Sequence, residues 1–169
     1  MQRRSEGELR QEVTNVCKLM HGRGLISAYD GNISVRLGPG RFLMTPSGVN
    51  KAFMQASDPV VMDARGRTLR GGARPSSEYR MHLAIYEARE DVGCVIHAHP
   101  PHCIACTLTG IPLDSLVLPE TAFLLGAVAT IPYETPGTDA FAAALLPHLP
   151  NRSALVLERH GSVTLGDDL

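Results

Sequence analysis

The sequence predicts one α/β domain in which helices cover the faces of a mostly antiparallel or mixed sheet. The chain has 169 residues, within the usual range for a single domain, and 44% of them are apolar, which is enough for one substantial core. Segments with helical spacing of apolar residues lie before, between and after pairs of short extended segments. The chain contains no repeat, low-complexity tract or linker, so we expect residues 1–169 to form one domain.

The first element is predicted to be an amphipathic helix. Ser5 and Glu8 have the spacing of a capping box, in which each side chain accepts a hydrogen bond from the other residue's backbone N–H. Gly22 and Gly24 mark its end. Between these limits the apolar residues recur at helical spacing, at Leu9, Val13, Val16 and Met20.

Two β-hairpins are predicted to follow this helix. Residues 33–37 and 41–45 have the pattern of strands and flank a Gly-Pro-Gly turn. Residues 59–62 and 68–70 flank a second polar turn in the same way. The first half of the sheet is therefore expected to be antiparallel.

The second half of the chain alternates between helices and strands. Ser76 or Ser77 is expected to cap a helix with Glu78 in its first turn, because apolar residues follow at spacings of three and four. Residues 92–99 have the alternation of a half-buried strand, and Pro100-Pro101 ends it and begins another helix. We expect further strands at 129–133, 153–158 and 162–165, and a helix at 139–146.

The charge pattern excludes several classes of partner. The 16 basic and 17 acidic residues are spread along the chain and give a net charge of −1, so no field favours nucleic acid or an anionic membrane. No apolar run approaches the roughly 20 residues of a membrane span, and residues 1–6 lack the apolar stretch of a secretory signal. We expect a cytoplasmic protein with a small-molecule partner and reduced cysteines.

His97 and His99 are the first candidate site residues. Side chains alternate along a strand, so both rings should project from one face, about 7 Å apart along the chain. A catalytic zinc ion usually has three protein ligands and an open position. His160 is the best third candidate because it lies beside Gly161 at a corner between two predicted strands.

Each of these residues also has a simpler interpretation. A lone His-x-His pair on a strand more often forms hydrogen bonds in the core, and a histidine at a corner is often only exposed to solvent. Cys103 and Cys106 have helical spacing and no second Cys-x-x-Cys, so we expect a packed helix face and leave them out of the metal site.

Three short polar segments could present backbone N–H groups to an anion. They are residues 31–34, 45–48 and 76–78, which contain small polar residues where strands or helices begin and end. Each segment alone is more simply explained as a turn or a helix cap.

Taken together, five segments resemble the class II aldolase and adducin family. Their order and spacing match across nearly the whole chain, and the branch they resemble is typified by L-fuculose-1-phosphate aldolase and L-ribulose-5-phosphate 4-epimerase. The segments are Asp30-Gly31-Asn32-Ile33-Ser34, Thr45-Pro46-Ser47-Gly48, Pro75-Ser76-Ser77-Glu78, His97-Ala98-His99-Pro100 and Arg159-His160-Gly161.

The resemblance implies a three-layer α/β/α fold with a largely antiparallel central sheet, and a homotetramer with active sites at subunit interfaces. It also implies Zn²⁺, or another divalent ion such as Mn²⁺ or Co²⁺. Tyr133 resembles a tyrosine that reaches a neighbouring subunit's site, where it would protonate or orient the aldehyde. The implied metal ligands are His97, His99 and His160, and the implied phosphate-binding residues are Gly31, Asn32, Ser47, Gly48, Ser76 and Ser77.

The implied reaction is cleavage of a ketose phosphate similar to fuculose 1-phosphate, to dihydroxyacetone phosphate and an aldehyde, through a zinc-stabilised enediolate. Glu78 would move the proton. A 4-epimerase makes the same cut and rejoins the products, but members that resemble the epimerases carry aspartate at position 78. A dehydratase, a decarboxylase or a non-catalytic module like the adducin head would have the same fold, and the three histidines with Glu78 argue against the last.

Two features depart from the family pattern. Tyr29 and Asp30 stand where some members have small or hydroxyl residues before Gly31, so the substrate could carry an anion other than phosphate. The chain also ends at Leu169 without the C-terminal helix and tail with which family members continue, so we expect a domain that lacks them.

Overall fold

The computed structural model describes residues 4–113, 119–126 and 128–169. Its helices are α1 (Glu6–Gly22), α2 (Tyr79–Ala88), α3 (Pro101–Thr109), α4 (Pro119–Leu124), α5 (Asp139–Leu145) and the short 3-10 helix η1 (Leu146–His148). Its strands are β1 (Asn32–Gly38), β2 (Arg41–Met44), β3 (Val60–Asp63), β4 (Thr68–Arg70), β5 (Cys94–Ala98), β6 (Ala129–Ile131), β7 (Ala154–Leu157) and β8 (Gly161–Gly166).

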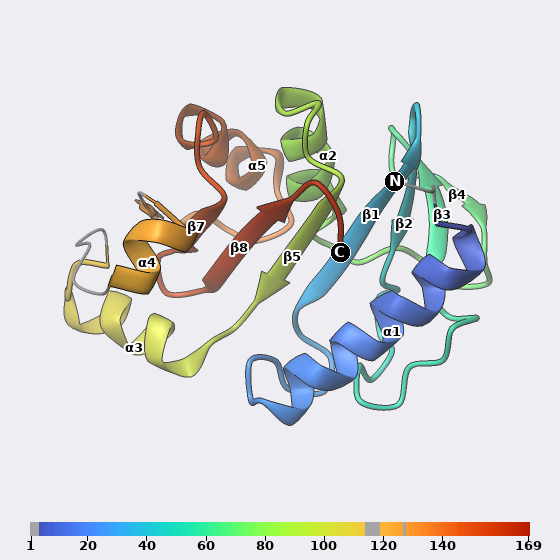
Figure 1. Ribbon diagram of the computed structural model, residues 1–169, viewed down its shortest axis with the longest axis horizontal. Helices are drawn as coiled ribbons and strands as arrows, with labels where there is room; N and C mark the ends of the chain where they lie inside the picture. The colour runs from blue at the N-terminus through green and yellow to red at the C-terminus, as the bar shows by residue number, and fades with distance from the viewer. Residues whose placement is uncertain (1–3, 114–118, 127) are drawn as a thin grey trace.

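The strands form one sheet in the order β4-β3-β2-β1-β5-β8-β7-β6. Every neighbouring pair is antiparallel except β6 and β7, which are parallel. The predicted α/β class with a largely antiparallel central sheet is confirmed. Strand β5 lies in the middle of the sheet, between β1 and β8 (Figure 1).

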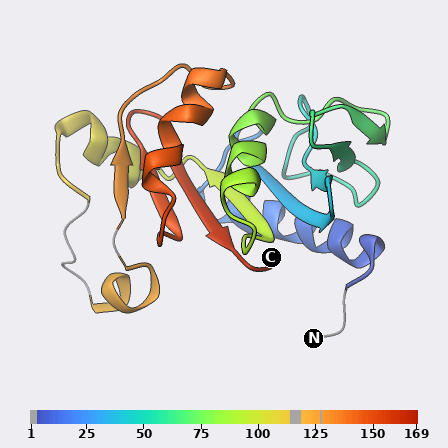
Figure 2. The same ribbon diagram turned by 90° about the horizontal axis from the view of Figure 1, so that it is seen from above.

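Helices cover both faces of the sheet, which gives three layers. Apolar residues of α1, such as Val13, pack with Ile33 on one face. On the other face Met81 of α2 and Phe141 of α5 pack with Val95 of β5. Figure 2 shows α1 on one side of the sheet and α2 with α5 on the other. Helices α3 and α4 lie beyond the β7–β6 end, and no residue of either helix is fully buried.

Most of the predicted elements are present. Both hairpins form, and the capping box of α1 is complete because Ser5 and Glu8 exchange side-chain and backbone hydrogen bonds. The expected strand at 129–133 ends at Ile131. None of the described helices has the length and apolar character that a membrane span requires.

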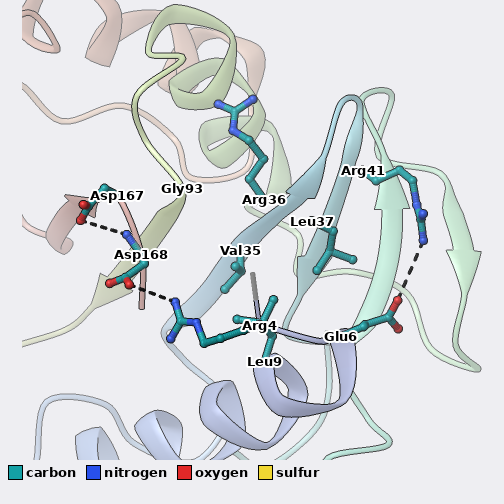
Figure 3. Close-up of a pocket in the computed structure, with 10 residues that line it drawn as sticks. All are labelled: Arg4, Glu6, Leu9, Val35, Arg36, Leu37, Arg41, Gly93, Asp167 and Asp168. Atoms are coloured by element: carbon teal, nitrogen blue, oxygen red, sulfur yellow. Dashed lines mark hydrogen bonds and ion pairs between the residues drawn. The ribbon is translucent and has the colours of Figure 1, made fainter. Parts of the chain in front are cut away.

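A cavity of about 410 Å³ opens at the end of β1 and β5 that is remote from His97 (Figure 3). Its lining carries charges of both signs, and these are paired: Arg4 contacts Asp168 at 3.3 Å, and Arg41 lies 3.9 Å from Glu6. Arg36 donates to backbone carbonyl groups at the C-terminal end of α2. The candidate site residues do not line this cavity.

Candidate metal centre

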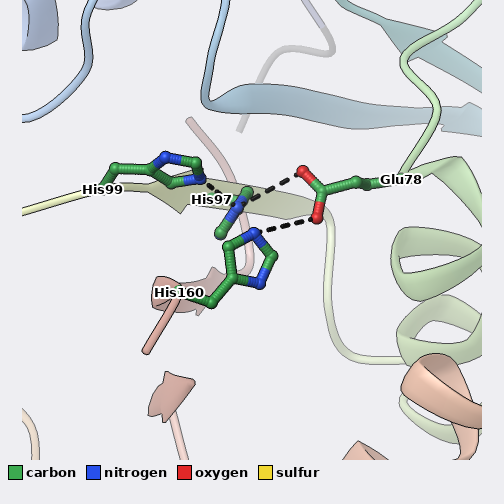
Figure 4. A group of neighbouring side chains, drawn as sticks. All are labelled: Glu78, His97, His99 and His160. Atoms are coloured by element: carbon green, nitrogen blue, oxygen red, sulfur yellow. Dashed lines mark hydrogen bonds and ion pairs between the residues drawn. The ribbon is translucent and has the colours of Figure 1, made fainter. Parts of the chain in front are cut away.

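Four side chains meet at one end of β5 (Figure 4). His97 lies in β5 and His99 just after it, Glu78 precedes α2, and His160 lies in the turn between β7 and β8. One donor atom from each residue lies within 4.8 Å of the other three. The structure therefore brings the three histidines that the sequence proposed as ligands together with the proposed acid/base.

Strand geometry brings His97 and His99 together. Their Nε2 atoms are 2.9 Å apart, so both rings project from the same face of the chain, as the alternation along β5 predicts. The intervening Ala98 faces the opposite side, where it joins the core under α1. His97 is completely buried and His99 is partly exposed, so the pair lies where the core meets the surface.

Two backbone features bring His160 to the other rings. Arg159 has a φ of 56°, a left-handed conformation that is uncommon for residues other than glycine. A Cβ atom on Gly161 would lie 2.2 Å from the carbonyl oxygen of Ala98, so only glycine allows the turn to approach β5 this closely. The ring centroid of His160 consequently lies 4.7 Å from that of His97 and 5.1 Å from that of His99.

Hydrogen bonds of the rings decide which nitrogen atoms are free to bind a metal. Nδ1 of His97 lies 2.9 Å from the carbonyl oxygen of Ser162 and donates its N–H to it. Nδ1 of His99 lies 3.2 Å from Oδ2 of Asp30, so a carboxylate stands beside this nitrogen. In a neutral ring Nε2 of His97 then carries a lone pair, and this lone pair faces Nε2 of His99 across 2.9 Å.

A cation between the rings would be within reach of both Nε2 atoms. The same cluster contains a buried carboxylate oxygen, Oε1 of Glu78, that has no hydrogen-bond partner among the described residues. Three converging imidazole nitrogens with a carboxylate beside them are a donor set that suits zinc and related divalent ions. The residues present therefore fit a bound metal ion.

Burial favours the neutral form of the histidines. Desolvation in the core lowers the pKa of His97 to about 3, and the neighbouring His99 acts in the same direction. Burial is also the main cause that lowers the pKa of His160, followed by the proximity of His97. Neutral imidazole is the form that binds a metal, so at neutral pH these two rings need not lose a proton first.

Glu78 occupies the N-cap position of α2, which corrects the prediction for this helix. The helix begins at Tyr79 rather than before Glu78, and no side chain caps it. The expected caps are engaged elsewhere: the N–H of Ser76 donates to the carbonyl of Thr45 at 3.0 Å, and its hydroxyl accepts a 3.4 Å bond from the N–H of Glu78. This backbone bond holds the segment before α2 against the strand end at Thr45, outside the helix.

As a result, the Glu78 side chain turns toward the histidines. Oε2 lies 3.3 Å from Nε2 of His97, and Oε1 lies 3.3 Å from Nε2 of His160. The residue is only 8% exposed, and it lies at a helix N-terminus, where the helix dipole favours negative charge. A buried carboxylate held beside metal-binding nitrogens is well placed for proton transfer.

The three polar segments proposed for anion binding lie side by side. The N–H of Thr45 donates to the carbonyl of Ile33, and the N–H of Ser47 donates to the carbonyl of Arg74 at 2.9 Å. Ser47, Gly48 and Ser77 are exposed at the ends of these segments, whereas Gly31, Asn32 and Ser76 are buried.

Lys51 bonds the backbone in and next to two of these segments, a role that the sequence interpretation missed. Its residue is 2% exposed, and its amine donates to the carbonyl groups of Tyr29, Pro46 and Val49 at 3.5, 3.4 and 3.1 Å. Burial lowers the pKa of this amine, although Cys17 and Asp30 act in the opposite direction. A lysine after a polar turn carries no pattern that distinguishes it from a solvated one, so the local sequence held no signal.

Asp30 and His82 are two further residues of the site that were not recognised. The sequence interpretation treated Asp30 as a departure that affects the anion, whereas the structure places its carboxylate on His99. His82 is buried one helical turn after Glu78, and it contacts Asn32. The spacing of four between Glu78 and His82 on an amphipathic helix is the signal that could have identified it.

Tyr133 lies on the surface beside the turn that carries His160. It is 45% exposed, and the guanidinium of Arg159 lies 4.7 Å from the centre of its ring. Its N–H donates to Oε2 of Glu158 at 3.1 Å. The ring is thus packed against its own chain on one side and open on the other.

An α/β/α fold with a mostly antiparallel sheet and a centre of three histidines and one glutamate defines the class II aldolase type of protein. Residues 11–169 match the sequence model of the class II aldolase and adducin N-terminal domain. The chain belongs to this family.

Relatives and solved structures agree with this assignment. The L-fuculose phosphate aldolase of Methanococcus maripaludis is 30% identical over 94% of this chain and 84% of that protein. The L-fuculose phosphate aldolase of an Escherichia coli O6:H1 strain is 32% identical over 92% of this chain and 72% of that protein. The structure of YgbL from Klebsiella pneumoniae superposes with a TM-score of 0.89 at 29% identity, over 98% of this chain and 82% of that one. Aldolase, epimerase and decarboxylase are named as candidate activities of YgbL.

Proposed function

We propose that the protein is a metal-dependent aldolase that cleaves a ketose phosphate, similar to L-fuculose 1-phosphate, to dihydroxyacetone phosphate and an aldehyde. The observation that carries the proposal is the convergence of three histidine rings and the Glu78 carboxylate at one end of β5. Two relatives named L-fuculose phosphate aldolase support the same class of reaction for this chain.

His97, His99 and His160 would hold the divalent ion. Zinc fits three imidazole nitrogens best, and manganese or cobalt could take its place. When bound, the ion supplies Lewis-acid stabilisation of the oxygen on which negative charge develops. The chain itself orients the ligands, because the carbonyl of Ser162 fixes the ring of His97 and the carboxylate of Asp30 fixes that of His99.

Glu78 is the residue that moves the proton. When the carbon–carbon bond breaks, its electron pair stays on the carbon next to the ketose carbonyl, and that carbon must then gain a proton. In the synthetic direction the same carbon loses this proton. The Glu78 carboxylate lies 3.3 Å from two of the proposed ligands, so a substrate held at the histidines would lie within its reach.

The substrate phosphate would bind at the joined polar segments. Gly31, Asn32, Ser47, Gly48, Ser76 and Ser77 are proposed to contact it. The buried amine of Lys51 supports this proposal because it bonds the carbonyl groups of Pro46, Tyr29 and Val49, in and next to two of the segments, and brings positive charge near them.

The active form is proposed to be a homotetramer in which Tyr133 acts in the site of a neighbouring subunit. The exposed apolar residues of the α3–α4 region support an interface there, because a surface of this kind is unusual on a monomer. They are Leu108, Ile111, Phe123, Leu124 and Leu125, of which Phe123 is 88% exposed. Tyr133 follows β6 and is partly exposed, and the guanidinium of Arg159 packs against its ring.

A sugar-phosphate 4-epimerase is the second candidate, because epimerase is one of the activities named for the similar YgbL structure. Both activities need the same metal centre and the same initial cleavage. Glutamate rather than aspartate at position 78 favours cleavage with release of the aldehyde. A decarboxylase, also named for YgbL, or a dehydratase would act at the same centre.

One assay separates these candidates. The protein is loaded with zinc and incubated with a panel of phosphorylated ketoses, while aldehyde release and isomer formation are followed in the same samples. An aldolase releases aldehyde and dihydroxyacetone phosphate, whereas an epimerase forms an isomer without free aldehyde. A zinc-loaded protein that changes none of the panel would contradict the proposal, and failure to bind any divalent ion would favour a binding module like the adducin head.

A further inference from the structure

A chain of buried hydrogen bonds runs from Glu78 into the core. Nδ2 of Asn32 donates to Oε2 of Glu78 at 2.8 Å, and Oδ1 of Asn32 contacts Nε2 of His82. Nδ1 of His82 lies 2.7 Å from Oγ of Ser34, which lies 2.8 Å from the hydroxyl of Tyr86. Asn32, Ser34, His82 and Tyr86 are all at most 3% exposed, and none of them belongs to the proposed metal ligands.

The carboxylate sets the direction of every donor in this chain. An ionised carboxylate only accepts hydrogen bonds, so Asn32 must present its NH₂ group to Glu78 and its carbonyl oxygen to His82. Nε2 of His82 must then carry the hydrogen, which leaves Nδ1 as the acceptor for Ser34. Ser34 in turn accepts from Tyr86. Burial lowers the pKa of His82 to about 3, so the ring is neutral and has only one ring hydrogen to place.

The helix and the strand have matching repeats, which makes this arrangement possible. Four residues of α-helix advance about 6 Å, and two residues of a strand advance about 6.6 Å. The helical side consists of every fourth residue from the N-cap of α2 onward, which are Glu78, His82 and Tyr86. The strand side consists of every second residue of β1, which are Asn32 and Ser34. Each strand residue therefore lies between two successive side chains of the helix and bonds to both.

We propose that His82 is a positioning residue: its Nε2–H fixes the orientation of the Asn32 amide and thereby holds the Glu78 carboxylate against the proposed metal centre. This proposal rests on the aldolase function proposed above, in which Glu78 moves the proton. Asn32 lies directly opposite His97 in the pairing of β1 with β5, so the carboxylate that its amide binds is held beside this ligand. If the amide turned by 180°, its oxygen would face the carboxylate and repel it.

Two substitutions distinguish positioning from a general structural effect. In His82→Gln the side-chain amide nitrogen can occupy the place of Nε2 and still donate to Asn32. In His82→Asn the shorter side chain reaches only the place of Nδ1, so the bond to Asn32 is lost although a buried amide is again present. We expect kcat of the zinc-loaded His82→Asn variant to fall roughly 10–100-fold, as small misplacements of a reacting group do, with KM for the ketose phosphate nearly unchanged.

His82→Gln is expected to keep kcat within about 3-fold of the wild type, because the conservative amide restores the donor. Both variants should retain one metal ion per chain, and His21→Gln, at an exposed histidine of α1, is the surface control. An equal loss of kcat in the Asn and Gln variants, or no loss in either, would overturn the proposal. Unfolding temperatures of both variants identify any loss that is due to misfolding.

A second measurement does not depend on turnover. Nitrogen NMR of the zinc-loaded protein, with the His82 signals assigned through the two variants, reports which ring nitrogen carries the hydrogen. The proposal requires the neutral Nε2–H form, and an Nδ1–H form would overturn it because Asn32 would then be reversed. If the protein cleaves no ketose phosphate but His82 is in the Nε2–H form, the aldolase function fails while the arrangement of the network is upheld.

Discussion

Oδ2 of Asp30 lies 3.2 Å from Nδ1 of His99, on the side of the ring opposite the nitrogen that faces His97. A carboxylate at this position restricts the orientation of the ring, as acidic partners of metal-bound histidines commonly do. Asp30 also accepts a hydrogen bond from the N–H of Ser27, so its own position is fixed by the backbone.

We therefore expect Asp30→Ala to weaken zinc binding by roughly 10–100-fold, the usual cost of losing such a partner. Competition with a chelator of known affinity measures the change. Asp58→Ala is a matched control, because Asp58 also accepts from the N–H three residues before it but lies outside the histidine cluster. Equal affinities of the Asp30→Ala variant and the wild type would show that the contact does not support the ligand.

Removal of the third ligand should abolish stoichiometric binding. In His160→Ala only two imidazole ligands are left, and two ligands hold a catalytic zinc ion weakly. Metal analysis after gel filtration should find one ion per chain in the wild type and in His102→Ala, whose histidine is exposed on α3, but much less than one in His160→Ala. Full occupancy in His160→Ala would mean that the ligand assignment is wrong.

Glu78→Gln separates proton transfer from metal binding. The amide has nearly the same shape, so the fold and the metal content should be retained, while turnover should fall by roughly 10²–10⁴, the range of general acid–base catalysis. The matched control is Glu87→Gln, which changes an exposed glutamate of the same helix. Activity at the wild-type level in Glu78→Gln would exclude this residue as the acid/base.

Stability should fall in acid because His82 is buried in its neutral form. Burial is the main cause that lowers its pKa from the usual 6.5 to about 3, so between these values the unfolded chain binds a proton that the folded chain does not. The stabilising contribution is complete above pH 6.5 and is lost as the pH falls, at about 1.4 kcal/mol per pH unit for this group. In metal-free protein, the free energy of unfolding measured in urea should fall less steeply between pH 6 and 4 for His82→Gln than for the wild type, by this amount. Identical pH dependence of the two proteins would contradict the prediction.

Subunit mixing tests the proposed role of Tyr133. Glu78→Gln and Tyr133→Phe are each expected to be nearly inactive, but hybrid oligomers would contain some interfaces at which both groups are wild type. Mixing should therefore restore part of the activity, while either variant mixed with itself should not. If mass measurements show subunit exchange but activity does not return, Tyr133 acts within its own chain or has no part in the reaction.

Patterns within single elements predicted much of this molecule. The capping box located α1, the turns located both hairpins, and strand alternation brought His97 and His99 to one face. The predicted start of α2 was wrong: Ser76 and Glu78 form a turn in which the N–H of Tyr79 donates to the carbonyl of Ser76, and the helix begins only at Tyr79.

The partners of the site residues could not be read from local patterns. Asp30 and His99 are far apart in the sequence, and they meet only because β1 pairs with β5. Such contacts are set by the order of strands in the sheet, which neither periodicity nor composition specifies.

The place of β5 also links a bound metal to the pairing of strands. His97 is contributed by β5 and His160 by the turn before β8, and these two strands pair with each other. An ion held by both residues would bind only when the two strands are paired, so its binding free energy would add to the stability of that pairing. The metal would then act as a cross-link between the middle of the sheet and the hairpin of β7 and β8.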